Sequence, residues 1–193
     1  MKRPVDLLAS SRVRLPDEQA LAELRGDIVR AAYVEGDFVS SGGERRSYYL
    51  DKYLFETRPA ILRRLTRFLA RLVPPGTERL AAPALGAVAL GTALSLDLGI
   101  PLVIVRPEAE GDERAVEGEL YPGERVTLVE DVVSTGRRAL TAGERVRRTG
   151  ARVARVVAVV DRQEGGAELL AAHALDYAHL FTPADLGIGM GGP

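Results

Sequence analysis

One stretch of the chain carries most of the information about the fold: residues 125–140 read RVTLVEDVVSTGRRAL. The segment Val126–Val129 predicts a buried strand, because it is short, apolar and rich in β-branched residues. Two adjacent carboxylates, Glu130 and Asp131, follow it, then a hydroxyl-bearing turn that ends at Gly136, then a segment with helical spacing. This order predicts a strand-to-helix connection in an α/β protein.

The same turn is suited to binding a sugar phosphate. Backbone N–H groups at a helix N-terminus, with hydroxyls beside them, form a ready site for phosphate. Carboxylates at the end of a strand accept hydrogen bonds from sugar hydroxyls. A solvated acidic turn followed by a hydroxyl helix cap is the competing interpretation, but the complete order of residues favours a ligand site. The candidate phosphate-binding residues are Val132, Val133, Ser134, Thr135 and Gly136.

Strands and helices alternate on both sides of this stretch. Short apolar runs bounded by turn residues predict strands, and three- and four-residue apolar spacing predicts helices. Such alternation is typical of a central parallel sheet flanked by helices. The predicted strands are Leu80–Ala82, Leu102–Val105, Val126–Val129 and Val153–Val160, and the predicted helices are Val88–Leu98 and Arg137–Thr149.

The N-terminal part predicts two helices separated by a β-hairpin. Helical spacing covers Pro16–Ala32, and a second helix is expected after Thr57 as its N-cap, ending before Pro74. Residues 37–55 contain two β-prone stretches around a Gly-Gly turn, which predicts a hairpin that stands apart from the main core.

Length and composition predict a single domain. The chain has 193 residues, which suits one domain over residues 1–193. We expect a core over residues 56–180 and a small hood formed by residues 1–55 together with the C-terminal segment.

Composition excludes several kinds of chemistry. The chain has no Cys and two His, which excludes thiolate zinc sites, Cys nucleophiles and His-rich metal clusters. A formal charge of −1 argues against a nucleic-acid binder that relies on bulk charge. No apolar run is long enough to span a membrane, and the charged N-terminus does not resemble a signal peptide, so we expect a cytoplasmic protein.

The pattern Glu-Asp-x-x-Ser-Thr-Gly at residues 130–136 resembles the motif with which type I phosphoribosyltransferases bind 5-phosphoribosyl-1-pyrophosphate. The rest of the chain is similar to the orotate phosphoribosyltransferase family within that group. The stretches that carry this resemblance are AAYVEGDFVSSGGERRSYYLDKYLF (31–55), APALGAVALGTALSLDLGIPLVIVR (82–106), VVDRQEGG (159–166) and LFTPADLG (180–187).

The resemblance implies the type I phosphoribosyltransferase fold and a reaction. Orotate and phosphoribosyl pyrophosphate would give orotidine 5′-monophosphate and pyrophosphate, a step of pyrimidine biosynthesis, in a homodimer. It also implies Mg²⁺, which should be held mainly by substrate oxygens and water because it loses its hydration shell reluctantly.

The resemblance also implies a role for each matching residue of the ribose phosphate half. Glu130 and Asp131 would hold the ribose hydroxyls, the turn at residues 132–136 would hold the 5′-phosphate, and Ser134 would face orotate. Arg162 suits the orotate carboxylate because a guanidinium pairs with a carboxylate through two hydrogen bonds, although a surface ion pair with Glu164 would also explain it.

Four further residues match the family pattern. Tyr48 and Tyr49 lie where the family packs aromatic side chains against the base, although neighbouring strand residues face opposite ways, so one of them can belong to the core. Lys52 is expected to support the hairpin or reach pyrophosphate, with a plain ion pair as the competing interpretation. Gly86 lies in a small-residue segment that matches the pyrophosphate loop.

The chain departs from the family pattern where positive charge is expected. Family members carry a catalytic loop that begins Arg-Lys-Glu-x-Lys and continues to a His. Here Arg106 is kept, but Pro107 and Glu110 stand at the lysine positions and Asp112 at the His position. Arg114 is a candidate replacement.

Two other departures concern the turn and the glycine segment. Arg137 and Arg138 follow Gly136, where the family has small residues, and Ser41 and Gly86 lie near positions at which it often has lysines.

These departures leave two alternatives to orotate transfer. One is a non-catalytic or regulatory relative that binds phosphoribosyl pyrophosphate or a nucleotide. The other is transfer to a different base, which the presence of Arg162 argues against.

Overall fold

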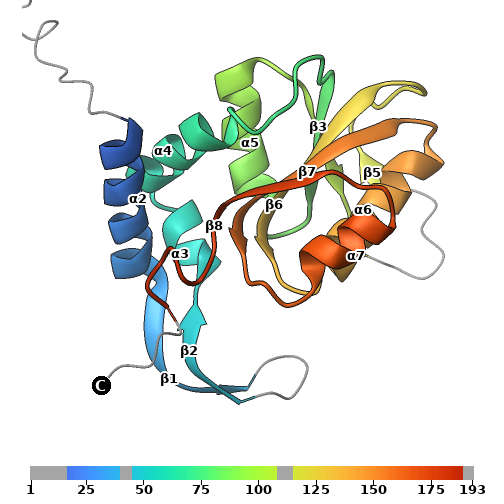
Figure 1. The fold of residues 1–193 in the computed structure, drawn as a ribbon. Helices are drawn as coiled ribbons and strands as arrows, with labels where there is room; N and C mark the ends of the chain where they lie inside the picture. Colours follow the sequence, from blue (N-terminus) through green and yellow to red (C-terminus); the bar gives the residue numbers. More distant parts are fainter. Residues whose placement is uncertain (1–16, 40–44, 108–114, 189–193) are drawn as a thin grey trace, which may run out of the picture.

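The computed structural model describes residues 17–39, 45–107 and 115–188, which form a sheet-based body with a hairpin arm (Figure 1). In chain order the elements are α2 (Asp17–Ala32), β1 (Tyr33–Val39), β2 (Arg45–Leu50), α3 (Lys52–Glu56), α4 (Pro59–Leu69), β3 (Arg79–Pro83), α5 (Val88–Leu98), β4 (Leu102–Val105), β5 (Val116–Glu117), β6 (Arg125–Val133), α6 (Arg137–Arg148), β7 (Arg152–Asp161), α7 (Gly166–Ala172) and β8 (Tyr177–Phe181).

The six-stranded sheet of the body has the order β5-β4-β3-β6-β7-β8. All its neighbours are parallel except β5, which pairs antiparallel with β4 at one edge. The chain therefore builds outward from β3 to β4 and then returns to β6 on the other side of β3. Ligands of open α/β sheets bind at such a reversal, beyond the carboxyl ends of the strands.

Helices cover both faces of this sheet, and two buried clusters reflect the two layers. One cluster joins α2, α4 and α5 to the sheet and includes Leu24, Leu65 and Leu90 together with Val157 of β7. The other joins α6 and α7 to the sheet and includes the adjacent β7 residue Val156. Successive strand residues point to opposite faces, so the continuous apolar run of β7 can serve both layers.

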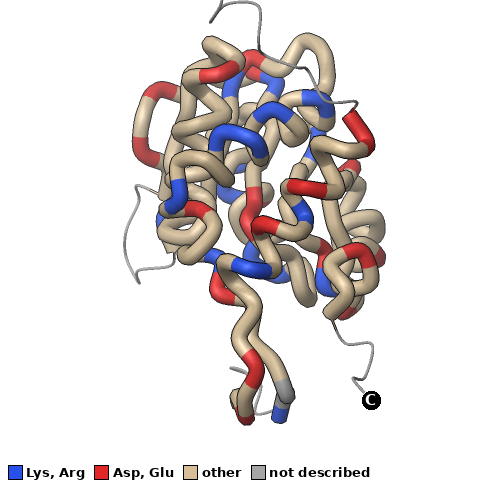
Figure 2. The backbone as a smooth tube through the Cα atoms, turned by 90° about the vertical axis from the view of Figure 1, so that its left-hand side faces the viewer, with Lys and Arg blue, Asp and Glu red and all other residues tan. Residues whose placement is uncertain are grey.

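A two-stranded antiparallel hairpin, β1–β2, projects from this body (Figures 1 and 2). It follows α2 directly, and Asp51 N donates a hydrogen bond to Ala32 O where the second strand returns to the body. The short helix α3 then begins at Lys52, with Asp51 as its N-cap. The base of the arm is thus fixed beside the sheet.

The α/β fold with a central, mostly parallel sheet and a separate hairpin is confirmed. The predicted helix over Val88–Leu98 and strand over Leu102–Val105 match α5 and β4. No helix within the described ranges is both long and apolar enough to cross a bilayer.

Three details of the predicted elements were wrong. Thr57 is the C-cap of α3 rather than the N-cap of the next helix, which begins at Pro59, because proline is favoured in the first helical turn. The end of the predicted hairpin, from Lys52, is helical. Strand β6 continues through the acidic pair to Val133, because its pairing with β7 persists to that point.

Candidate active site

The acidic pair lies at the switch point of the sheet, within the last residues of β6. Glu130 and Asp131 are each about 1% exposed. Asp131 Oδ2 accepts a hydrogen bond from Lys52 Nζ at 2.5 Å, and Asp131 Oδ1 accepts one from Val132 N at 2.5 Å. The ion pair with Lys52 joins the base of the hairpin arm to the sheet, so one carboxylate is fixed from two sides.

The loop after β3 passes directly over this ion pair at Gly86. A Cβ placed on Gly86 would overlap both Asp131 Oδ2 and Lys52 Nζ. Only glycine allows the backbone to approach the charged groups so closely. The structure therefore brings together three sequence-predicted site residues, Lys52, Gly86 and Asp131, that come from three separate segments.

Two further carboxyl groups are buried beside Asp131. Burial and the neighbouring charge of Asp131 raise the pKa of Glu130 to about 8, while Arg138 and Lys52 act in the opposite direction. Burial and Asp131 also raise the pKa of Glu56 in α3 to about 8. Neither carboxyl has a hydrogen-bond partner among the described residues. Near neutral pH a protonated Glu130 can therefore both donate to and accept from a hydroxyl-bearing ligand.

The turn between β6 and α6 is held by main-chain packing. Arg162 N donates to Val133 O at 2.8 Å. Gly166, at the start of α7, lies so close that a Cβ there would be 2.6 Å from Ser134 O, and one on Gly136 would be 2.9 Å from Gly166 O. Helix α6 has no side-chain N-cap, so its first N–H groups are available to an anion.

Two hollows adjoin the acidic pair: one is lined by its neighbour Val132, and the other by Gly86, which packs against Asp131. The smaller has a volume of about 20 Å³ and brings Tyr48 of the hairpin together with Val132 and Arg162. Arg162 Nε also lies 3.1 Å from Glu164 Oε1, so the ion pair proposed as the competing interpretation exists on the rim of this hollow.

The two predicted tyrosines separate in the structure. Tyr48 lines the small hollow and stacks on Tyr33, with ring centroids 5.9 Å apart. Tyr49 is 43% exposed and packs against Phe38, with centroids 5.6 Å apart. Strand alternation therefore places only Tyr48 beside Arg162.

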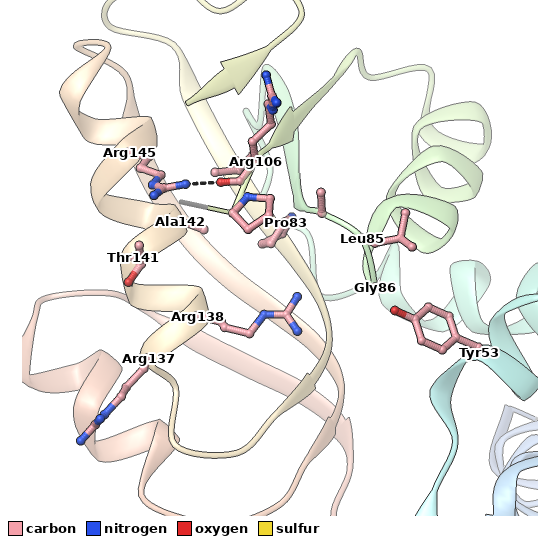
Figure 3. A pocket seen from close by; sticks show the side chains of 13 residues that line it. Tyr53, Pro83, Leu85, Gly86, Arg106, Arg137, Arg138, Thr141, Ala142 and Arg145 are labelled. Carbon is pink, nitrogen blue, oxygen red and sulfur yellow. Dashed lines mark hydrogen bonds between the residues drawn. The ribbon is translucent and has the colours of Figure 1, made fainter. Parts of the chain in front are cut away.

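The larger hollow, of about 420 Å³, is lined by Gly86, which packs against Asp131 (Figure 3). Its walls come from the loop Pro83–Gly86, from the end of β4 and from the first turns of α6. Arg106 and Pro107 line it, and Arg106 also forms an ion pair with Glu117 at 3.2 Å. The predictions for Ser41, Glu110, Asp112 and Arg114 lie outside the described residues.

Sequence reasoning missed two residues of this site. Glu56 gave no motif signal; only its position four residues after Lys52 on one helix face connects it to the site. Gly166 belongs to the Gly-Gly pair of the segment at 159–166, but its close approach to the turn depends on tertiary packing.

Comparison with known proteins agrees with this geometry. The phosphoribosyl transferase domain family matches residues 56–173. Orotate phosphoribosyltransferase of Halobacterium salinarum is 44% identical over 153 residues, covering 78% of this chain and 87% of the relative. That of Methanocella arvoryzae is 40% identical with the same coverage.

Solved structures of orotate phosphoribosyltransferases are also similar to this chain. Mycobacterium tuberculosis H37Rv orotate phosphoribosyltransferase in complex with 5-phospho-alpha-D-ribosyl 1-diphosphate is 31% identical, with a TM-score of 0.75 over 88% of this chain and 99% of that one. Orotate phosphoribosyltransferase from Aeropyrum pernix is 31% identical, with a TM-score of 0.77 over 89% of this chain and 99% of that one. With this fold, this acidic pair and these relatives, the chain belongs to the orotate phosphoribosyltransferase family, a family of pentosyltransferase enzymes.

Proposed function

We propose that the chain transfers ribose 5-phosphate from phosphoribosyl pyrophosphate to orotate, giving orotidine 5′-monophosphate and pyrophosphate in pyrimidine biosynthesis. The observation that carries this proposal is that the acidic pair Glu130 and Asp131 adjoins two separate hollows, one through Val132 and the other through Gly86. One hollow contains Arg162, and the other is lined by arginines and the Gly86 loop. A substrate with a ribose at its centre, a base on one side and pyrophosphate on the other matches this order.

Each part of the substrate then has a set of residues to bind it. The ribose hydroxyls bind Glu130 and Asp131, and the 5′-phosphate binds the backbone of residues 132–136 at the start of α6. Arg162 pairs with the orotate carboxylate, with Tyr48 beside the base in the same hollow. The family resemblance gives Ser134 of the turn a contact with orotate. Lys52 acts on the ribose side by holding Asp131 in place.

The protein needs to supply little covalent chemistry for this transfer. Orotate N1 forms a bond to the anomeric carbon as the bond from that carbon to the pyrophosphate oxygen breaks. The bonding electrons leave with pyrophosphate, and the N1 proton passes to solvent. Positive charge develops on the ribose and negative charge on the leaving group, so positioning and charge stabilisation account for most of the catalysis.

We propose that Mg²⁺ enters this site on the substrate. The donor set suits that arrangement: Asp131 is engaged with Lys52, and the described residues hold no group of three His, Asp or Glu placed to ligate a metal ion. The larger hollow leaves room for a hydrated diphosphate complex. When bound, the ion supplies positive charge to the pyrophosphate oxygens.

We further propose that the chain works as a homodimer in the cytoplasm, with no nucleic-acid or membrane partner. A sequence pI near 6.2 supports the absence of a nucleic-acid partner. Light scattering on the purified protein tests the dimer, and a mass of one chain, 20.8 kDa, would contradict it.

Purified protein with Mg²⁺, phosphoribosyl pyrophosphate and orotate tests the reaction directly, followed by the loss of orotate absorbance. We expect turnover that requires all three components. Calorimetric binding of phosphoribosyl pyrophosphate without turnover of any common base would instead support the non-catalytic alternative, and turnover of uracil but not orotate would support transfer to another base.

A further inference from the structure

The larger hollow is lined by arginine side chains and contains no carboxylate among its lining residues (Figure 3). Four arginines are among its lining residues, Arg106, Arg137, Arg138 and Arg145, and the rest of its wall is mostly apolar side chains and the backbone around Gly86. An apolar wall lowers the local dielectric and strengthens the attraction of these cations for an anion. The hollow is therefore suited to a multiply charged anionic group.

The four arginines are not equivalent. Arg145 is 7% exposed and donates a hydrogen bond to the backbone carbonyl of Arg106. Arg106 is engaged with Glu117. Arg137 lies at the rim and its guanidinium points away from the hollow (Figure 3). Arg138 points into the space facing Gly86 and Tyr53 (Figure 3).

The position of Arg138 in α6 is unfavourable without an anion. It is the second residue of the helix, where the helix dipole disfavours positive charge. Within the described parts of the chain, no hydrogen bond or ion pair involves its guanidinium, although it lies close enough to Glu130 to act on that group electrostatically. A bound anion beside the guanidinium would remove this unfavourable interaction.

We propose that Arg138 binds the pyrophosphate group of phosphoribosyl pyrophosphate and stabilises the charge that develops on it as the bond to the anomeric carbon breaks. This inference rests on the proposed function and adds a catalytic residue to it. Arg138 projects from α6 toward the Gly86 loop on the facing wall of the hollow (Figure 3). It therefore supplies, from a fixed element, the positive charge missing at Pro107, where the family has a lysine.

Arg138→Ala tests the assignment, with Arg137→Ala as the matched control. The two residues are adjacent, exposed and in the same helical turn, so unfolding or a change of net charge should affect both variants alike. We expect Arg138→Ala to lower kcat/KM for phosphoribosyl pyrophosphate about 10²-fold, the typical effect of losing one preorganised donor, and Arg137→Ala to change it less than about threefold. Arg138→Lys should recover part of the loss, because it keeps the charge but not the planar fork.

Binding measurements separate the pyrophosphate role from a 5′-phosphate role. Calorimetry with Mg²⁺ and inorganic pyrophosphate should show weaker binding to Arg138→Ala than to the wild type or Arg137→Ala. Orotidine 5′-monophosphate, which has the 5′-phosphate but no pyrophosphate, should bind all three proteins alike. An equal loss for both ligands, or no loss for either, would overturn the proposal.

The same measurements distinguish this proposal from the proposed function. If the wild type fails to turn over orotate, the proposed function fails, whereas pyrophosphate binding that depends on Arg138 would still support the anion site. If the wild type turns over orotate and Arg138→Ala does so equally well, only the role of Arg138 fails.

Discussion

Lys52 and Asp131 are 79 positions apart in the sequence, yet Nζ and Oδ2 lie 2.5 Å apart in the folded chain. Lys52 is the first residue of α3, and Asp131 is in the last part of β6. The pair therefore connects the hairpin arm to the strand that carries the acidic residues. Both side chains are largely removed from water, with Asp131 only 1% exposed, so each depends on the other for compensation of its charge.

A double-mutant cycle should reveal this dependence. Lys52→Met leaves the Asp131 carboxylate buried without its partner and should lower the free energy of unfolding by about 3 kcal/mol. Adding Asp131→Asn removes the unpaired charge, so the double variant should be more stable than Lys52→Met alone. Urea denaturation measures both values, and a strictly additive loss would show that the pair does not interact.

Gly86→Ala should damage both stability and activity. The added methyl would meet the Lys52–Asp131 pair, so either the loop or the ion pair must shift, at a cost of about 1–3 kcal/mol. We expect a lower Tm and a rise in KM for phosphoribosyl pyrophosphate. Gly26→Ala is the control, because its methyl would meet only the flexible end of Arg30 in the middle of α2, and it should keep full activity.

Glu56 should make the folded protein less stable as pH rises from about 5 to about 8. Its pKa is near 8 in the folded chain, whereas an unfolded glutamate has a pKa of about 4.3. Protonated Glu56 therefore favours the folded state at low pH, and this contribution is lost as pH rises through the folded pKa. Glu56→Gln keeps the shape of the side chain and removes the titration.

Thermal unfolding of the wild type and Glu56→Gln across that pH range measures the effect. Near pH 5 the two Tm values should be similar, and by pH 8 the variant should unfold at a temperature higher by on the order of 5 °C. Glu130 titrates in both proteins, so only the difference between them reports on Glu56. A difference that stays constant with pH would contradict the prediction.

Arg162→Ala should affect orotate far more than phosphoribosyl pyrophosphate. Arg162 lines the small hollow with Tyr48, away from the arginine-lined hollow. We expect KM for orotate to rise about 10–100-fold, because a charge-assisted bidentate pair is lost, with little change in KM for phosphoribosyl pyrophosphate. Glu164→Gln, which removes only the rim ion pair, is the control. Equal losses for both substrates would exclude Arg162 as the base-recognition residue.

The fold was largely predictable from sequence because its strongest signals are local. Val88–Leu98 ends at Gly99, which adopts φ of 67°, and Leu102–Val105 is a short apolar run between Pro101 and Arg106, so spacing and turn residues determine both elements. The short edge strand Val116–Glu117 was not predictable, since it exists only through its pairing with β4.

The site was predictable only where the sequence order carries chemistry. The acidic pair and the turn of residues 132–136 follow one another along the chain, and the structure places them together at the switch point. The ion pair of Lys52 with Asp131 and the direction of the Arg138 side chain depend on how distant segments pack. The spacing of residues along the chain does not predict such packing. For Tyr48 and Tyr49, alternation predicts that the two differ but does not determine which one faces the site.

The close packing of Gly136 against Gly166 has an evolutionary consequence. Neither position has room for a side chain, and in the proposed function the turn binds phosphate through its main chain. A substitution can therefore change the proposed phosphate site only by moving the backbone. The opposite half is made of long side chains on a helix surface, and these can be exchanged one at a time. Amino-acid substitutions among relatives should therefore concentrate in the arginine-lined hollow, on the proposed leaving-group side. The turn on the proposed ribose phosphate side should change only where the backbone around it also changes.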